Sequence, residues 1–165
     1  MALVHVPYPG ENKCQGLCGQ KIYNPSVPVR HGLGCIYPGK MIFISGIPDS
    51  KSPRFSINFK SHKGEVRGNA FHFDVRFEYK GSKDTIVRNA RNKGQWGSEE
   101  RSPSKPFPFK RNEFFEMVVL VEESCYKVAV NDRHLLEFNH RLSLEEVDTL
   151  VIRGDVRICM VRIQG

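Results

Sequence analysis

The chain has 165 residues, of which 39% are hydrophobic and 26% are charged. That balance is typical of one globular domain with a sizeable core, and it excludes a disordered or collagen-like chain. The longest uninterrupted apolar run, residues 117–121, is far shorter than the ~20 residues that a membrane-spanning helix needs. The first residues lack a charged segment followed by an apolar block, so we expect neither a membrane span nor a secretory signal.

The chain is basic, with 25 Lys and Arg against 18 Asp and Glu and a formal net charge of +7. An excess of that size can favour nucleic acid, anionic glycans or membrane surfaces. The cations are scattered, however, and no block of five or more occurs. We therefore interpret the charge as a solvated basic surface and expect no nucleic-acid partner.

The cysteines form an odd set of five with no evident disulfide framework, which suggests synthesis in a reducing compartment: Cys14, Cys18, Cys35, Cys125 and Cys159. Cys14 and Cys18 are separated by three residues, and no His or Cys follows at a zinc-finger interval. We therefore predict no metal site and no cofactor.

The predicted organisation is a flexible N-terminal segment, residues 1–22, followed by one domain over residues 23–165. Residues 1–22 are rich in Pro, Gly, Asn, Gln and Cys and show no periodicity. From there on, short apolar or alternating runs are separated by turn residues, and each run predicts a strand. The predicted strands are 40–45, 54–60, 69–79, 84–89, 113–121, 125–130, 134–138, 150–153 and 156–163.

Many short strands at regular spacing indicate an all-β protein, an antiparallel sandwich or barrel. Asn131-Asp132 and Gly154-Asp155 each lie between two predicted strands, so both predict tight hairpin turns. Only residues 143–147 look helical, because Ser143 and Glu146 have the spacing of a capping box.

The strand at 69–79 alternates strictly and carries most of the functional information. Five large apolar side chains share one face and must belong to the core: Phe71, Phe73, Val75, Phe77 and Tyr79. The opposite face presents His72, Asp74 and Arg76 at steps of ~7 Å, which is about the span of one sugar ring. These groups can donate to and accept from one small ligand, although a surface ladder of ion pairs would look the same.

Two later segments add to that row. Val87 and Asn89 end the next predicted strand on one face. The only Trp of the chain, Trp96, is flanked by glycine and charged residues rather than apolar ones, which predicts an exposed indole. A bulge or bend at Gly97 would bring Trp96, Glu99 and Arg101 to one side.

An exposed indole beside such polar groups is suited to a sugar. The apolar C–H face of a sugar ring can lie on an aromatic ring, while its hydroxyl rim needs directional donors and acceptors. Galactose, whose 4-hydroxyl is axial, exposes a broad C–H patch on one face. The combined segments therefore favour carbohydrate binding over a solvated strand face.

Three motifs resemble the signature of the galectins, the β-galactoside-binding lectins. They are His72-x-Asp74-x-Arg76, Val87-x-Asn89 and Trp96-Gly97-x-Glu99-x-Arg101. The resemblance runs from about Tyr23 to Gly165 in the order that the family shows, and it includes the segments at 70–73, 106–110, 126–131 and 140–142.

The resemblance implies a jelly-roll sandwich with the sugar across its concave sheet. His72, Asp74 and Arg76 would meet the galactose 4-hydroxyl, and Arg76 would also reach the ring oxygen. Asn89 and Glu99 would meet the 6-hydroxyl, and Trp96 would stack on the C–H face. Glu99, Arg101 and Arg76 would hold the 3-hydroxyl of the following glucose or N-acetylglucosamine, with Glu99 keeping both guanidinium groups oriented.

The chain departs from the family at two positions, with Asp74 where Asn is usual and Val75 where Pro is usual. An aspartate can accept from the 4-hydroxyl but cannot donate to it, and its charge can compete with the sugar for Arg76. We therefore expect weaker or shifted β-galactoside binding. The alternative is a galectin-like domain that has lost sugar binding and works through protein contacts.

The resemblance also implies further expectations and leaves rival functions open. We expect no enzyme, because a glycoside hydrolase needs two facing carboxylates and the adjacent Glu99 and Glu100 point to opposite faces of an extended segment. The expected partners are β-galactoside-bearing glycans and glycoproteins, with a homodimer or a tandem partner domain supplying a second site. Galectin-like localisation would be cytoplasmic with leaderless secretion, and nuclear for a fraction.

Overall fold

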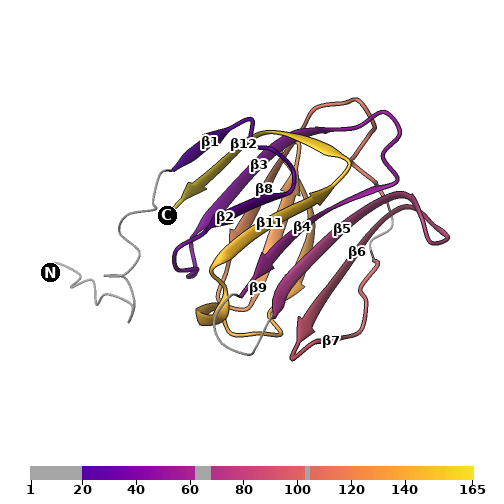
Figure 1. The fold of residues 1–165 in the computed structure, drawn as a ribbon. Helices are drawn as coiled ribbons and strands as arrows, with labels where there is room; N and C mark the ends of the chain where they lie inside the picture. Colours follow the sequence, from indigo (N-terminus) through magenta and orange to yellow (C-terminus); the bar gives the residue numbers. More distant parts are fainter. Residues whose placement is uncertain (1–19, 62–67, 103–104) are drawn as a thin grey trace, which may run out of the picture.

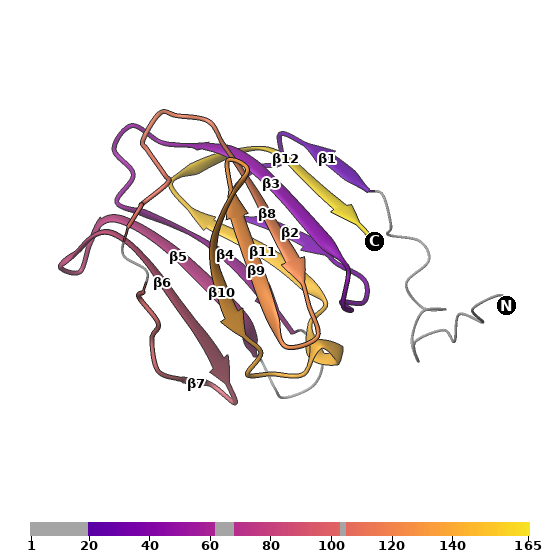
Figure 2. The same ribbon diagram turned by 180° about the vertical axis from the view of Figure 1, so that it is seen from behind.

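A computed structural model describes residues 20–61, 68–102 and 105–165 of the chain. Its strands form two six-stranded antiparallel sheets that pack face to face (Figures 1 and 2). The predicted all-β sandwich is confirmed, because β-strands supply both layers and the described residues add only one short 3₁₀ helix.

The first sheet has the order β1-β12-β3-β8-β9-β10, and each neighbouring pair is antiparallel. Its strands are β1 Lys21–Tyr23, β3 Met41–Pro48, β8 Phe115–Val121, β9 Cys125–Val130, β10 Arg133–Asn139 and β12 Val156–Gln164.

The second sheet has the order β2-β11-β4-β5-β6-β7 and contains the strand with the polar row. Its strands are β2 Val29–Gly32, β4 Arg54–Lys60, β5 Asn69–Tyr79, β6 Ser82–Asn92, β7 Gln95–Trp96 and β11 Thr149–Gly154. The predicted strands 54–60, 69–79 and 125–130 match β4, β5 and β9 in both bounds. The sequence did not predict β1, β2 and β7, which have two to four residues each and lack room for a readable alternation.

The predicted N-terminal segment 1–22 lies mostly outside the described residues, and Lys21–Tyr23 pairs with β12 as an edge strand. The predicted helical turn is η2, a 3₁₀ helix over Leu144–Glu146. The Ser143 hydroxyl caps it by accepting from the backbone N–H of Glu145.

One predicted hairpin turn is confirmed and the other is wrong. Asn131 and Asp132 have φ values of 51° and 63° and join β9 to β10 in the first sheet. Gly154-Asp155 instead carries the chain from β11 in the second sheet to β12 in the first. Gly154 has φ of 101°, and a Cβ there would lie 2.6 Å from the Cα of Phe55, so this crossing requires glycine.

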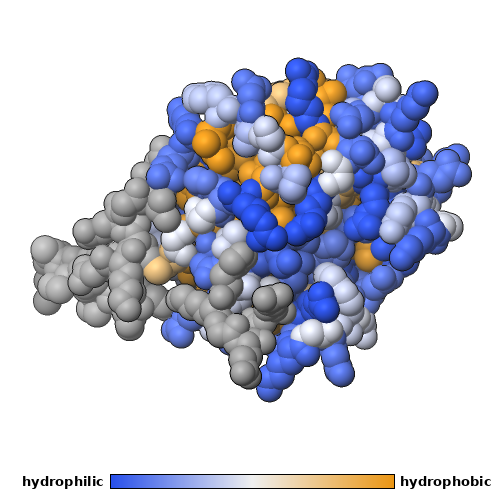
Figure 3. All heavy atoms as spheres, viewed as in Figure 1, coloured by the Kyte–Doolittle hydropathy of each residue, from blue (hydrophilic) through white to orange (hydrophobic). Residues whose placement is uncertain are grey.

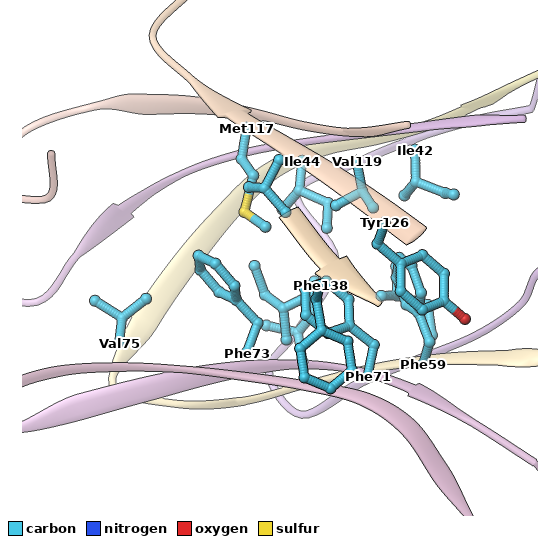
Figure 4. Close-up of a cluster of buried hydrophobic side chains, with 14 of the residues drawn as sticks. Ile42, Ile44, Phe59, Phe71, Phe73, Val75, Met117, Val119, Tyr126 and Phe138 are labelled. Atoms are coloured by element: carbon cyan, nitrogen blue, oxygen red, sulfur yellow. The ribbon is translucent and has the colours of Figure 1, made fainter. Parts of the chain in front are cut away.

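The core fills the space between the sheets and is rich in aromatic rings (Figure 4). The Phe71 ring of β5 stacks on Tyr126 at 4.9 Å between centroids and on Phe138 at 5.1 Å. Because Tyr126 and Phe138 come from β9 and β10, these contacts fix β5 against the opposite sheet. The core face of β5 therefore anchors the strand whose other face carries the polar row.

Two of the described cysteines, Cys125 and Cys159, are free, whereas Cys35 is disulfide-bonded. The sequence shows no evident disulfide framework, and the disulfide of Cys35 is therefore a feature that only the structure reveals. Among the residues that the structure describes, no helix is long and apolar enough to cross a membrane.

Polar and charged residues cover much of the visible surface, with hydrophobic residues gathered in the upper part of the view (Figure 3). Among the residues that the structure describes, the large hydrophobic side chains that are exposed are Tyr23, Trp96 and Phe114.

Replacing Phe71 by alanine should lower the free energy of unfolding by about 3–5 kcal/mol, because it opens a cavity between the two sheets. Urea unfolding monitored by circular dichroism measures the change. Phe114→Ala is the matched control, since that ring is 53% exposed and should change stability by less than about 0.5 kcal/mol. Equal losses in the two variants would contradict the description of the core.

Candidate functional site

The outer face of the second sheet, which we call the site face, carries the polar row of β5. The core cluster takes Phe71, Phe73, Val75 and Phe77 from this strand, so the intervening side chains point outward. The neighbouring strands add polar groups at the same level, because Asn58 of β4 and Asn89 of β6 are the register partners of His72. His72 therefore lies in the middle of a polar strip that crosses three strands.

Trp96 stands at the edge of this strip, on the short strand β7. Its side chain is 49% exposed, as the sequence predicted, and its ring centroid lies 4.9 Å from that of His72. The Arg91 guanidinium carbon is 5.8 Å from the indole centroid. The indole thus offers an open apolar surface beside the polar row.

His72 is held in one tautomer by its neighbour on β4. Its Nδ1 lies 2.6 Å from Asn58 Oδ1, and the Asn58 amide nitrogen donates to the Val151 carbonyl. The Asn58 oxygen is therefore an acceptor, so Nδ1 of His72 carries the proton and Nε2 keeps a lone pair. Burial lowers the pKa of His72, with the Arg54 and Arg76 charges acting in the same direction and Asp74 opposing them. The His72 imidazole is therefore neutral, and its Nε2 can accept a hydrogen bond.

Asp74 is fully buried beneath two arginines although it lies on the site face. One carboxylate oxygen accepts from Nε of Arg54 at 3.0 Å, and the other accepts from Nε of Arg76 at 2.8 Å. Both guanidinium groups also lie over the Tyr79 ring, at 4.4 Å and 5.3 Å from its centroid. The predicted contact of Asp74 with a ligand would require one of these arginines to move, and it stays a prediction.

Arg76 and Arg101 meet at Ser82, and Arg101 also pairs with Glu99. Glu99 accepts from Nη2 of Arg101 at 2.7 Å, and both Arg101 and Arg76 donate to the Ser82 hydroxyl, at 2.8 Å and 3.3 Å. The prediction that Glu99 orients two guanidinium groups holds for Arg101 only. Arg76 pairs with Asp74 instead.

The segment that carries Glu99 and Arg101 is tied to β6 by backbone hydrogen bonds. Gly97 donates to the Ala90 carbonyl at 3.0 Å, and Arg88 and Glu100 exchange two hydrogen bonds of 2.8 Å. A Cβ at Gly97 would lie 3.0 Å from Nη1 of Arg141 and 3.3 Å from Oδ1 of Asn89. Close approach, rather than an unusual backbone conformation, is thus what glycine permits here.

All seven predicted residues lie on or beside the site face: His72, Asp74 and Arg76 on β5, Asn89 on β6, Trp96 on β7, and Glu99 and Arg101 after it. Sequence reasoning missed Arg54, Asn58, Ser82 and Arg141. Alternation along β4, in which Phe55, Ile57 and Phe59 belong to the core, places Asn58 on the opposite face. Its meeting with His72, however, depends on the register between β4 and β5, which the sequence does not encode locally.

The acidic groups of the site are paired with arginines. Glu99 pairs with Arg101 and Glu100 with Arg141, each at 2.7 Å. Within 20–61, 68–102 and 105–165, no group of three or more His, Cys, Asp or Glu side chains could hold a metal ion. The arrangement is suited to hydrogen bonding a neutral polar ligand against an exposed indole.

Comparison with known proteins decides the family, since the sequence profile described as "Galactoside-binding lectin" matches residues 28–163. The chain belongs to the galectin family. It is 35% identical to galectin-4 of Rattus norvegicus over 164 residues, which cover 99% of this chain and 47% of that protein. It is 39% identical to galectin-3 of Oryctolagus cuniculus over 138 residues, which cover 80% of this chain and 53% of that protein. This galectin chain thus spans about half the length of the curated relatives it matches.

Solved structures agree with the jelly-roll sandwich expected of a galectin. The galectin LEC-6 of Caenorhabditis elegans superposes with a TM-score of 0.77 at 23% identity, covering 88% of this chain and 96% of that one. Sheep galectin-11 in complex with glycerol gives a TM-score of 0.72 at 27% identity, covering 82% of this chain and 96% of that one.

Asp74→Asn should lower the free energy of unfolding of this galectin by about 1–3 kcal/mol, because a neutral amide leaves Arg54 and Arg76 without a shared counter-ion. Urea unfolding at low salt measures the change. Glu137→Gln is the control, since it removes an exposed carboxylate 3.7 Å from Lys127 and should have almost no effect. Unchanged stability of the Asp74 variant would show that the carboxylate does not hold the two arginines.

His72 should make stability fall as the pH is lowered below 6.5. Its pKa is lowered in the folded chain, so between the folded pKa and 6.5 the unfolded state binds more protons. The contribution is fully present above pH 6.5 and is lost as the pH falls towards the folded pKa. Chemical unfolding at several pH values should therefore show that the free energy of unfolding depends less steeply on pH in His72→Gln than in the wild type. A His72→Gln variant whose stability depends on pH as steeply as that of the wild type would contradict the assignment.

Proposed function

We propose that this galectin binds β-galactosides non-covalently, with lactose and N-acetyllactosamine-type glycans as its ligands. The observation that carries the proposal is the exposed Trp96 indole, whose centroid lies 4.9 Å from the neutral His72 imidazole. An apolar ring face next to a fixed acceptor suits the C–H face of galactose and its axial 4-hydroxyl. No catalytic step is proposed.

The proposed contacts follow from the donors and acceptors that the site leaves available. Nε2 of His72 accepts from the 4-hydroxyl, and Arg76 donates to it from its remaining N–H groups. Asn89 and Glu99 contact the 6-hydroxyl. Arg101, already paired with Glu99, donates to the 3-hydroxyl of the second sugar with little further loss of side-chain freedom.

Asp74 acts in this proposal as the counter-ion that orients Arg76 and Arg54. Because Arg76 uses its Nε for Asp74, fewer of its donors are available to a sugar, which favours weaker or shifted binding. The same observation supports the alternative of a galectin domain that has lost sugar binding and works through protein contacts. Retention on lactose-agarose separates the two functions.

We further propose that cross-linking of glycoproteins depends on a second site. One chain offers one site, so either a homodimer or a partner domain in a longer protein must supply the other. Cytoplasmic synthesis with leaderless secretion, and nuclear residence of a fraction, complete the proposal. The disulfide of Cys35 would suit the oxidising space outside the cell.

Trp96→Ala should weaken lactose binding by about 2 kcal/mol or more, roughly thirtyfold in Kd, because the galactose C–H face loses its apolar support. Isothermal titration calorimetry with lactose measures the loss. Maltose, which contains no galactose, should not bind either protein, and Phe114→Ala should retain wild-type affinity because its exposed ring lies before β8 in the first sheet.

The salt dependence of the same titration tests the rival functions. Hydrogen bonds to neutral hydroxyls should leave the lactose Kd nearly unchanged between 50 and 200 mM salt, a range in which nucleic-acid binding weakens steeply. Absence of lactose binding by the wild type, with no retention on lactose-agarose, would overturn the proposal in favour of protein contacts. Release of free galactose from lactose would instead reveal an enzyme.

A further inference from the structure

Arg141 connects the first sheet to the sugar site on the second. It follows β10, where its guanidinium carbon lies 4.8 Å from the centroid of the Phe138 ring. Nη1 donates to Oδ1 of Asn89 at 2.9 Å, and Nη2 donates to Oε2 of Glu100 at 2.7 Å. The two partners precede Arg141 by 52 and 41 residues, so only the tertiary fold brings these groups together.

These bonds fix which end of the Asn89 amide faces a ligand. Its Oδ1 accepts from Arg141 and from the backbone N–H of Ala90 at 2.8 Å, which fills both lone pairs. Its Nδ2 donates to the Gly97 carbonyl at 2.8 Å, which leaves one N–H. Since the residue is 4% exposed and bonded on both ends, the amide is held in one orientation. Asn89 can therefore serve a ligand only as a donor.

We infer that Arg141 is a positioning residue that holds Asn89 as a hydrogen-bond donor only. The site therefore selects ligands with a hydrogen-bond acceptor at galactose C6. The inference rests on the proposed function for its ligand. Without the guanidinium, the Asn89 oxygen loses a donor and the amide is free to turn. Glu100 also loses the partner that ties the 97–101 segment to the opposite sheet.

The absence of a side chain at Gly97 supports this role. An alanine Cβ there would press on Nη1 of Arg141 and Oδ1 of Asn89, at 3.0 Å and 3.3 Å, and so on the two atoms that form the bond. Gly97→Ala is therefore an independent way of disturbing the same contact without removing a charge.

The test is a cycle of two proteins and two ligands. Methyl β-lactoside and its analogue lacking the galactose 6-hydroxyl are titrated into the wild type and into Arg141→Ala by calorimetry. In the wild type, loss of the 6-hydroxyl should weaken binding by about fivefold or more, because it removes the neutral hydrogen bond from Asn89 together with the contact to Glu99. Arg141→Ala should weaken binding of the parent lactoside by a similar factor and leave binding of the deoxy analogue within about twofold.

Two further variants separate positioning from charge. Arg141→Lys, which keeps the cation but has no fork to span Asn89 and Glu100, should recover only part of the affinity. Lys127→Ala is the matched control, because it removes a cation that pairs with Glu122 and Glu137 on the first sheet. It should bind both ligands as the wild type does.

The Asn89 amide itself gives a readout that needs no sugar. In ¹H–¹⁵N spectra of the ligand-free wild type, its side-chain N–H signals should exchange slowly with solvent, and they should exchange faster in Arg141→Ala and Gly97→Ala. Unchanged exchange would overturn the inference whether or not lactose binds. Equal loss of affinity for both ligands in Arg141→Ala would also overturn it, since a purely structural role predicts that result. If the wild type shows the protected amide but binds no lactoside, the specificity role falls together with the proposed function, and the positioning of Asn89 stands.

Discussion

Two arginines face each other across adjacent strands at the centre of the site, and a single carboxylate keeps them there. Arg54 of β4 and Arg76 of β5 are direct register partners, an arrangement in which like charges repel. Asp74 lies two residues before Arg76 on the same face of β5. Its carboxylate accepts a hydrogen bond from Nε of each arginine. Because the carboxylate is completely buried beneath the two side chains, it neutralises part of their charge and fixes their planes. The polar row can therefore stay ordered on the outer face of the strand.

This ion-pair arrangement gives the aspartate at this position the role of a counter-ion within the site. With an asparagine, the position would offer a neutral amide to a sugar and would leave Arg76 to other acceptors. With Asp74, the negative charge is paired with the two arginines of the site, and Arg54 thereby becomes part of the site. The neighbouring His72 is affected as well, since burial and the two arginine charges lower its pKa more than Asp74 raises it. The imidazole is thus left neutral, with an acceptor facing outward beside Trp96.

The site depends on both sheets, although its predicted contacts all belong to one. The core face of β5 packs through Phe71 onto Tyr126 and Phe138 of the first sheet, and these contacts hold the strand in place beneath the polar row. On the other side of the site, Arg141 reaches from the first sheet to Asn89 and Glu100. Two separate contacts with the first sheet therefore hold the site. The Phe71 contacts support the polar row, and the Arg141 contacts support the part of the site next to Trp96.

The sequence by itself determined the layers and the chemistry of the site. Strict alternation along β5 separates a core face from a polar face, because successive side chains of a strand point to opposite sides. Trp96 without apolar neighbours had to be exposed. The register between strands, the partner of each carboxylate and the passage from β11 to β12 were decided only by the tertiary structure. Arg54, Asn58 and Arg141 reach the site from positions 14 to 52 residues away from their partners, and no local pattern records contacts over that separation.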